Sequence, residues 1–201
     1  MTSCLVTDRN RADVLEQARR AVDAGVDLIQ IRERDLEAAP LADLVTAVLG
    51  VTRSSSTRVV VNDRLDVALS CGADGVHLRS DSIAAADARR LAPRPILVGR
   101  SVHSAAEAAS AGDVDYLIAG TVFATSSKPG AACIGLDGLR TIVRAAAAPV
   151  LAIGGIDAAR LRDIAETGAA GIAAIGWFSS GPLSEIVVAA RAAFDTAKAR
   201  P

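Results

Sequence analysis

The stretch VLAIGGIDAARLRDIAETGAAGIAAI, residues 150–175, decides the fold. It begins with a short apolar run at 150–153 and passes through a glycine pair into a segment, 158–167, whose apolar residues have helical spacing. A second glycine turn then leads into another apolar run at 171–175. A strand, a helix and a strand in this order predict two parallel strands of one sheet.

The same alternation recurs along the whole chain. Short apolar runs rich in β-branched residues predict strands at 4–7, 28–32, 59–61, 75–78, 96–99, 116–119, 150–153 and 171–175. Helical spacing predicts helices at 12–24, 41–52, 65–70, 83–91, 105–111, 136–146, 158–167 and 183–199. Eight strand–helix pairs close a barrel, whereas an open doubly wound sheet usually carries a G-x-G-x-x-G turn that is absent here. We therefore expect an α/β fold, a single (β/α)8 TIM barrel, with residues 1–201 as one domain.

Composition excludes several classes of protein. The chain has 201 residues, 51% of them apolar, and a formal net charge of −1, so a disordered chain is excluded. Lysine and arginine number 22 against 23 acidic residues, and aromatics are 2%, which argues against nucleic-acid binding. No apolar run reaches the ~18 residues of a membrane span, and no secretory signal is visible. Three widely spaced cysteines fit a reducing cytoplasm, and a homo-oligomer is compatible with the sequence.

The sharpest cluster of polar residues follows the second predicted strand. Gln30, Arg32 and Arg34 alternate along the chain, so their side chains are expected on one face. Guanidinium groups match phosphate oxygens, which predicts a phosphate or pyrophosphate site. The alternative is a set of ion pairs with Glu33 or Asp35, but Glu33 alternates to the opposite face.

Two carboxylates follow the next two predicted strands. Asn62 and Asp63 end the third strand, and Asp81 follows the fourth. Mg²⁺ takes one or two carboxylates together with substrate phosphates and water, so these residues are candidate metal ligands. The alternative for each is capping of the helix that follows.

Three further features are candidates for phosphate binding or proton transfer. Gly154 and Gly155 allow backbone N–H groups to approach a phosphate, or form only a tight turn. The long loop at 124–135, with its hydroxyls and one lysine, is either a lid or an ordinary solvated loop. His77 and His103 are the only histidines, and either is more often structural than catalytic.

These residues together resemble a known family. The phrases that carry the resemblance are TD at 7–8, QIRERD at 30–35, NDR at 62–64, GADGVHL at 72–78, SVH at 101–103, GTVFATSSK at 120–128 and AIGGI at 152–156. In this order and spacing they resemble thiamine phosphate synthase and its relative, the thiazole tautomerase, over residues 4–178. The resemblance implies a transferase that joins an aminopyrimidine methyl diphosphate to a thiazole phosphate, releases pyrophosphate and requires Mg²⁺.

The resemblance also implies roles for single residues. By position, the pyrimidine diphosphate would be held by Gln30, Arg32, Arg34, Asn62 and Lys128, and Arg32 and Lys128 would assist departure of pyrophosphate. Asp63 matches a Mg²⁺ ligand, and Ser101 matches a residue near the pyrimidine. Residues matching the thiazole phosphate site are Thr125, Ser127, Gly155 and Ile175.

Three departures from the synthase pattern accompany this resemblance. Arg34 stands where the synthase has lysine, and Gly176 stands where it has a phosphate-binding serine. The second metal aspartate of the synthase falls on Ser82 by strict count, with Asp81 one position earlier. Some phrases lean toward the tautomerase, yet its acid–base histidine falls on Thr121. We therefore expect a thiamine phosphate synthase, with a metal-free tautomerase or a non-catalytic binder of thiamine-related phosphates as alternatives.

Overall fold

The chain forms a closed barrel of eight parallel strands, as the sequence predicts. A computed structural model describes residues 1–125, 130 and 132–198. Neighbouring strands pair in sequence order, and β1 pairs with β8 to close the ring. The strands are β1 (Thr2–Val6), β2 (Leu28–Ile31), β3 (Arg58–Asn62), β4 (Gly75–Leu78), β5 (Leu97–Val102), β6 (Tyr116–Ala119), β7 (Val150–Ile153) and β8 (Gly171–Ala174).

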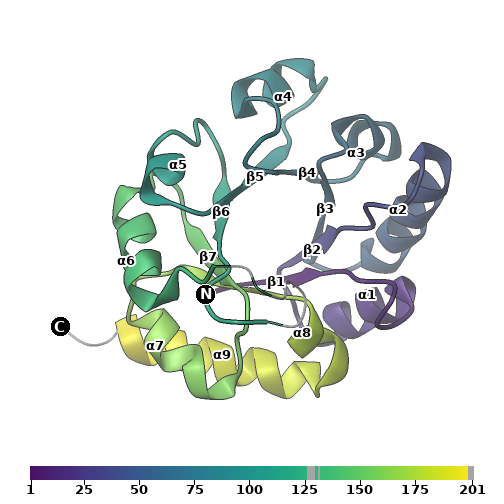
Figure 1. The fold of residues 1–201 in the computed structure, drawn as a ribbon. Coiled ribbons are helices and arrows are strands. Elements are labelled where there is room, and N and C mark those ends of the chain that lie inside the picture. Colours follow the sequence, from purple (N-terminus) through teal and green to yellow (C-terminus); the bar gives the residue numbers. More distant parts are fainter. Residues whose placement is uncertain (126–129, 131, 199–201) are drawn as a thin grey trace.

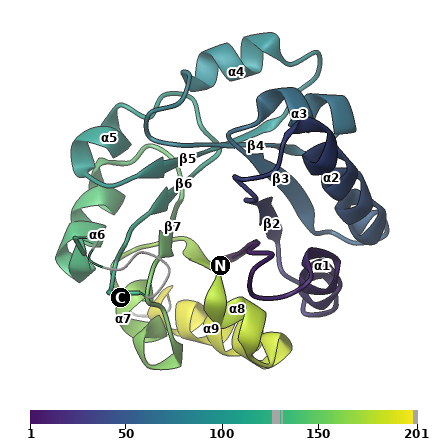
Figure 2. The ribbon, with the colours of Figure 1, turned by 45° about the vertical axis from the view of Figure 1, so that its right-hand side comes forward.

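The helices surround the strands on the outside of the barrel (Figure 1 and Figure 2). They are α1 (Val14–Asp23), α2 (Ala38–Thr52), α3 (Leu65–Cys71), α4 (Ala85–Leu91), α5 (Ala105–Ala109), α6 (Gly135–Ala145), α7 (Leu161–Ala165), α8 (Gly176–Ser180) and α9 (Leu183–Lys198). A 3₁₀ turn, η1 (Ala158–Arg160), precedes α7. None of the described helices is long and apolar enough to cross a membrane.

Several boundaries differ from the prediction. β5 runs on to Val102, so Ser101 lies within the strand rather than after it. α2 begins at Ala38, before the predicted start at residue 41. Pro40 lies in its first turn, where proline is tolerated. The predicted helix at 158–167 is split into η1 and α7, and α8 was not predicted.

Alternation along the strands divides the side chains between two layers. Cys4 and Val6 point into the barrel, whereas Leu5 between them packs outward against the helices. The outward residues form one large apolar core with the helices, and its members include Ile29, Val61 and Ile172. Because the strands are parallel, the inward residues nearest their carboxyl ends all reach the same mouth.

Aspartates fix the opposite end of the barrel. Asp74 precedes β4 and accepts a hydrogen bond from the Val59 N–H of β3 at 2.7 Å. Asp115 precedes β6 and accepts from the Val98 N–H of β5 at 2.6 Å, and Asp27 likewise accepts from Ser3 of β1 at 2.8 Å. Each carboxylate therefore joins the start of one strand to its neighbour.

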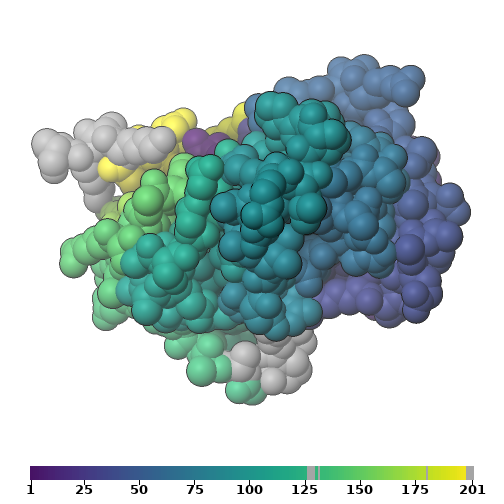
Figure 3. Space-filling view, turned by 90° about the horizontal axis from the view of Figure 1, so that it is seen from above, coloured from purple at the N-terminus to yellow at the C-terminus, as the bar shows by residue number. Residues whose placement is uncertain are grey.

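The first and the last strand of the barrel meet at the β1–β8 contact. The Thr2 N–H donates to the Ala170 carbonyl at 3.0 Å, and Thr2 pairs with Gly171. In the space-filling view the N-terminal segment shows only as a small purple patch beside yellow atoms of the C-terminal helix (Figure 3). The closure of the barrel therefore depends on contacts between the first and the last strand.

Candidate active site

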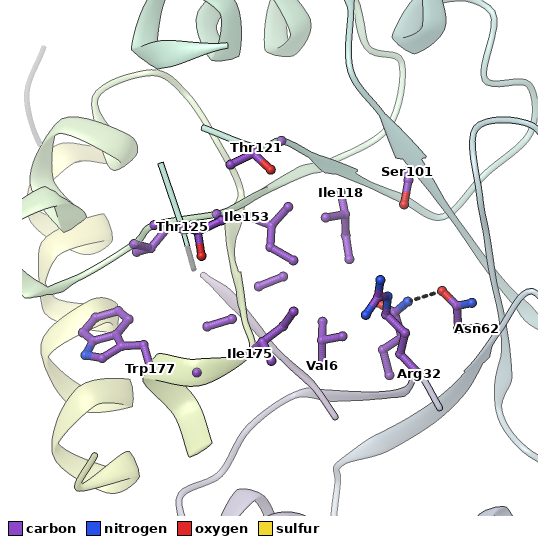
Figure 4. Close-up of a pocket in the computed structure, with 18 of the residues that line it drawn as sticks. Val6, Arg32, Asn62, Ser101, Ile118, Thr121, Thr125, Ile153, Ile175 and Trp177 are labelled. Carbon is purple, nitrogen blue, oxygen red and sulfur yellow. Dashed lines mark hydrogen bonds between the residues drawn. The ribbon is translucent and has the colours of Figure 1, made fainter. Parts of the chain in front are cut away.

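A cavity of about 340 Å³ opens at the carboxyl ends of the strands. Figure 4 shows that it has two polar ends and an apolar middle. Arg32, Asn62 and Ser101 lie at one end, and Thr125 and Trp177 lie at the other. The strip between them is made by Val6, Ile118, Ile153 and Ile175.

The first end is built by residues at and just after the carboxyl ends of β2 and β3. Gln30, Arg32 and Arg34 all line the cavity, in agreement with their predicted common face. The Gln30 amide donates to the Asn62 side-chain oxygen at 3.0 Å, which orients both amides. The first end therefore presents two cations and two amides to one ligand.

The two arginines at this end are held apart from carboxylates. In the part of the chain that the structure describes, neither Arg32 nor Arg34 forms an ion pair. Burial of the Arg32 guanidinium, together with the like charge of Arg34, lowers the pKa of Arg32. Glu33 turns to the opposite side and accepts a hydrogen bond from the Thr7 hydroxyl at 2.6 Å. A multiply charged anion would relieve the repulsion between the two guanidinium groups.

Ser101 ends a chain of buried hydrogen bonds. The His77 Nε2 lies 2.9 Å from the Ser101 hydroxyl, and the His77 Nδ1 lies 3.1 Å from the Tyr116 hydroxyl. Complete burial, with the charges of Arg100 and Arg32 nearby, lowers the pKa of His77 to about 3. The imidazole is therefore neutral near pH 7, and it orients the Ser101 hydroxyl at the cavity wall.

Glycine at position 99 makes room for this chain. A Cβ at Gly99 would lie 2.2 Å from the Tyr116 ring, so no other residue fits there without displacing the tyrosine. Burial also raises the pKa of the Tyr116 hydroxyl, which keeps it a hydrogen-bond donor. The absence of a side chain at Gly99 therefore provides the space that the Tyr116 ring occupies inside the barrel.

The second end is built by glycines after β7 and β8. Gly154 and Gly155 have φ values of 105° and 60°, which glycine adopts without strain. A Cβ at Gly155 would lie 2.4 Å from the Ala124 carbonyl oxygen. Among the described residues, the N–H groups of Gly154 and Gly155 have no hydrogen-bond acceptor. These amides are suited to an anion.

Asp63 and Asp81, the predicted metal ligands, lie beside the first end but do not line the cavity. Arg79 lies between them: its Nη1 is 3.6 Å from the Asp63 carboxylate, and its Nη2 is hydrogen-bonded to Asp81. The Ser82 hydroxyl donates to the other Asp63 oxygen. Within the described ranges, no group of three or more histidine, cysteine, aspartate or glutamate side chains is placed to hold a metal.

The structure brings most of the predicted substrate-binding residues together around the cavity, and the remaining two lie outside the described residues. Those that line the cavity are Gln30, Arg32, Arg34, Asn62, Ser101, Thr125, Gly155 and Ile175. Ser127 and Lys128 lie outside the described residues.

The lining residues that had not been predicted to bind substrate include Arg11, Thr121, His103 and Trp177. His103 and Thr121 were noted in the sequence for other roles, and the His103 Nδ1 is hydrogen-bonded to the Gly120 carbonyl. Arg11 and Trp177 had no signal beyond their place after β1 and β8, where the loops of a barrel form the site.

Comparisons with known proteins agree with this geometry. The family model for thiamine monophosphate synthase matches residues 3–178. The thiamine-phosphate synthase of Methanoregula boonei is 46% identical over 153 residues, which cover 74% of this chain and 70% of that protein. The thiamine-phosphate synthase of Pyrococcus furiosus is 38% identical over 165 residues, covering 81% and 79%.

A solved structure is also similar over almost the whole chain. It is the thiamine phosphate pyrophosphorylase from Pyrococcus furiosus, with a TM-score of 0.85 and 33% sequence identity. The match covers 98% of this chain and 96% of that one. The cavity described above therefore lies in a barrel whose similarity extends from the N-terminal strand to the last helix.

Proposed function

The chain belongs to the thiamine monophosphate synthase family, and from that premise we propose how its barrel makes thiamine phosphate. The enzyme is a transferase that joins an aminopyrimidine methyl diphosphate to a thiazole phosphate and releases pyrophosphate. The observation that carries this assignment is the division of one cavity into two anion-binding ends with an apolar strip between them. Two phosphorylated substrates, each with an aromatic ring, match that division.

The diphosphate binds at the first end. Arg32 and Arg34 neutralise the charge that grows on the pyrophosphate as its bond to the pyrimidine methylene breaks. Gln30 and Asn62, held by their mutual hydrogen bond, donate to the remaining polar atoms of the substrate. Little acid–base chemistry is needed, because departure of the leaving group makes the pyrimidine methylene electrophilic.

The pyrimidine lies over the apolar strip, next to Ser101. The hydroxyl of Ser101, oriented by neutral His77, hydrogen-bonds to the pyrimidine. The strip carries no side-chain heteroatom, so the electrophilic methylene meets the thiazole nitrogen rather than a protein nucleophile. The thiazole phosphate binds at the second end, against Gly155, Thr125 and Ile175.

Mg²⁺ fits the donor chemistry beside the first end. Asp63 and Asp81 supply carboxylate oxygens, and a Mg²⁺ site commonly uses one or two carboxylates with phosphate oxygens and water. When bound, the metal adds positive charge to the leaving pyrophosphate. Arg79 already pairs with both carboxylates, so the diphosphate itself is needed to complete the site.

The proposed roles of Lys128 and Ser127 come from the sequence resemblance, because both residues lie outside the described part of the chain. We assign Lys128 to the leaving pyrophosphate and Ser127 to the thiazole phosphate, on the family pattern alone. The reaction uses small molecules from solution, and Cys4, Cys71 and Cys133 form no disulfide, which supports a cytoplasmic location.

A coupled pyrophosphate assay tests the function. The purified protein is incubated with both substrates, with and without Mg²⁺, and thiamine phosphate is quantified by chromatography. We expect equal amounts of pyrophosphate and thiamine phosphate, and loss of both when Mg²⁺ is chelated. Absence of pyrophosphate release would contradict the assignment, and metal-free isomerisation of a thiazole carboxylate phosphate would replace it with the tautomerase.

A further inference from the structure

Arg11 lies at the second end of the cavity, in the loop between β1 and α1. Its guanidinium packs against Gly176 at the start of α8: a Cβ at that glycine would lie 3.1 Å from the Arg11 Nη1 and 3.3 Å from its Cζ. Glycine at 176 therefore leaves the space that the guanidinium occupies. Gly176, Trp177 and Arg11 all line the cavity.

The charge of Arg11 is only partly used within the protein. Its Nε donates to the Asp8 carboxylate at 3.2 Å, an interaction three residues apart in the chain. Among the described residues, the two terminal nitrogens have no acceptor, and Asp8 is the one carboxylate within ion-pair distance. Asp8 thus orients the guanidinium through its Nε and leaves the two terminal nitrogens, Nη1 and Nη2, able to donate to a ligand.

Arg11 also differs in position from the other cations of the cavity. The arginines among the described lining residues are Arg11, Arg32 and Arg34, and the latter two follow β2. Arg32 lies beside Asn62, across the apolar strip from Trp177 (Figure 4). Arg11 packs against Gly176, the residue that precedes Trp177 in the chain. It therefore brings positive charge to the end of the cavity that Arg32 does not reach.

We propose that Arg11 binds the phosphoryl group of the thiazole substrate and so decides that this end accepts a phosphorylated ring. The inference rests on the proposed function and adds a residue to it. Backbone amides at Gly154 and Gly155 supply dipoles but no net charge, so a dianionic phosphoryl group needs a cation to balance it. The fork of the guanidinium supplies that charge together with two donors.

Direct binding measurements test the role of Arg11 without requiring turnover. Isothermal titration calorimetry would measure the affinities of the wild type and of Arg11→Ala for three ligands: the thiazole phosphate, the same thiazole alcohol without phosphate, and pyrophosphate. We expect Arg11→Ala to weaken thiazole phosphate binding by about 10- to 100-fold, the loss typical of one hydrogen-bonded charge. Binding of the alcohol and of pyrophosphate should change by less than about 2-fold, within the usual effect of a surface substitution.

Two further variants sharpen this test. Arg11→Lys keeps the charge without the fork and should recover part of the affinity for the thiazole phosphate. Arg140→Ala is the matched control, because Arg140 also pairs with an aspartate three residues away and is similarly exposed, but lies on α6 outside the cavity. Arg140→Ala should bind all three ligands as the wild type does.

The outcomes separate this inference from the function on which it rests. Unchanged thiazole phosphate affinity in Arg11→Ala, or equal weakening of thiazole phosphate and pyrophosphate binding, would overturn the inference. A wild type that binds no thiazole phosphate would overturn it as well. If binding depends on Arg11 but the wild type releases no pyrophosphate with both substrates, the inference stands and the synthase function fails.

Discussion

At the scale of single residues, the site depends on charges that the protein leaves unpaired. Arg32 is the clearest case, because its guanidinium lies in the cavity beside Arg34 with no carboxylate partner in the described chain. We expect Arg32→Ala to lower kcat/KM by about 100-fold, since it removes charge where the leaving group develops it. Steady-state pyrophosphate release checks this. The control is Arg162→Ala, because Arg162 lies on the exposed surface of α7. If Arg32→Ala kept activity within about 3-fold of the wild type, Arg32 would have no role in the mechanism.

Arg79 belongs to the same scale, because it competes for the candidate metal ligands. Its hydrogen bond to Asp81 lowers the pKa of that carboxyl, so Asp81 is ionised and already neutralised by a guanidinium. We expect the wild type to bind Mn²⁺ weakly without substrate and more tightly with pyrophosphate. Arg79→Ala should strengthen binding of Mn²⁺ to the ligand-free protein several-fold.

Electron paramagnetic resonance of free Mn²⁺ measures both affinities. Arg90→Ala, a variant of an exposed arginine paired with Asp87 on α4, serves as the control. Tight Mn²⁺ binding by the ligand-free wild type would show that Arg79 does not limit access to the carboxylates.

His77 makes stability depend on pH. Its pKa is about 3 in the folded protein and about 6.5 in the unfolded chain, so the unfolded chain binds more protons between these values. The stability that neutral His77 contributes is therefore full above pH 6.5 and is lost as pH falls toward 3. The loss amounts to about 2 kcal/mol at pH 5.

Urea denaturation at pH 7.5 and pH 5 measures this dependence. The free energy of unfolding should fall less between these pH values in His77→Gln than in the wild type. The comparison uses the change with pH within each protein, so a lower absolute stability of the variant does not affect it. Equal changes in the two proteins would place the titration of His77 outside this range.

The residues of the site differ in how far the sequence could predict them. Gln30, Arg32 and Asn62 could be placed because strand alternation fixes which side of the barrel each faces. Arg11 could not, since its place depends on the path of a loop and on the space left by a glycine far away in the chain. The Arg79–Asp63 contact likewise joins two loops whose relative position no local pattern encodes.

At the scale of elements, the strands were more predictable than the helices. A short apolar run between turns can start and end at few places, whereas helix ends depend on caps and packing. α8 has five residues and too few turns for periodicity to be visible, so it was missed. The consequence for the site was direct, because Gly176 and Trp177 belong to α8.

The aspartates before β2, β4 and β6 predict a measurable effect on strand pairing. Asp74→Ala removes the acceptor of the Val59 N–H, and we expect a loss of about 1.5–3 kcal/mol in the free energy of unfolding. Asp137→Ala, at a carboxylate that is 98% exposed on α6, should change stability by less than about 0.5 kcal/mol. Chemical denaturation of both variants measures the difference, and equal stabilities would mean that the strand-start carboxylate is dispensable.

At the scale of the whole molecule, the barrel closes where its first and last strands meet. A Cβ at Gly171 would lie 1.8 Å from the Thr2 carbonyl oxygen, so a side chain there separates β1 from β8. We expect Gly171→Ala to cost about 3 kcal/mol or more, since a backbone clash cannot be relieved by a rotamer change. Gly50→Ala, with no atom within 4 Å of the added Cβ in α2, should instead stabilise by about 0.5–1 kcal/mol.

Urea midpoints of these two glycine variants decide the matter, because the substitution is the same and the expected signs are opposite. A Gly171→Ala variant as stable as the wild type would show that the two strands can move apart without loss of closure.

The division of the cavity into two polar ends, each proposed to bind an anion, has a consequence for the design of ligands. A single molecule that carries a diphosphate mimic at one end and a phosphate mimic at the other, joined by a flat apolar linker, would occupy both ends at once. Once one end is bound, the other group is held at a high effective concentration near its own site, so such a bivalent ligand gains affinity without any new contact. A rigid linker of matching length would retain this gain, whereas a flexible one would lose part of it to conformational entropy.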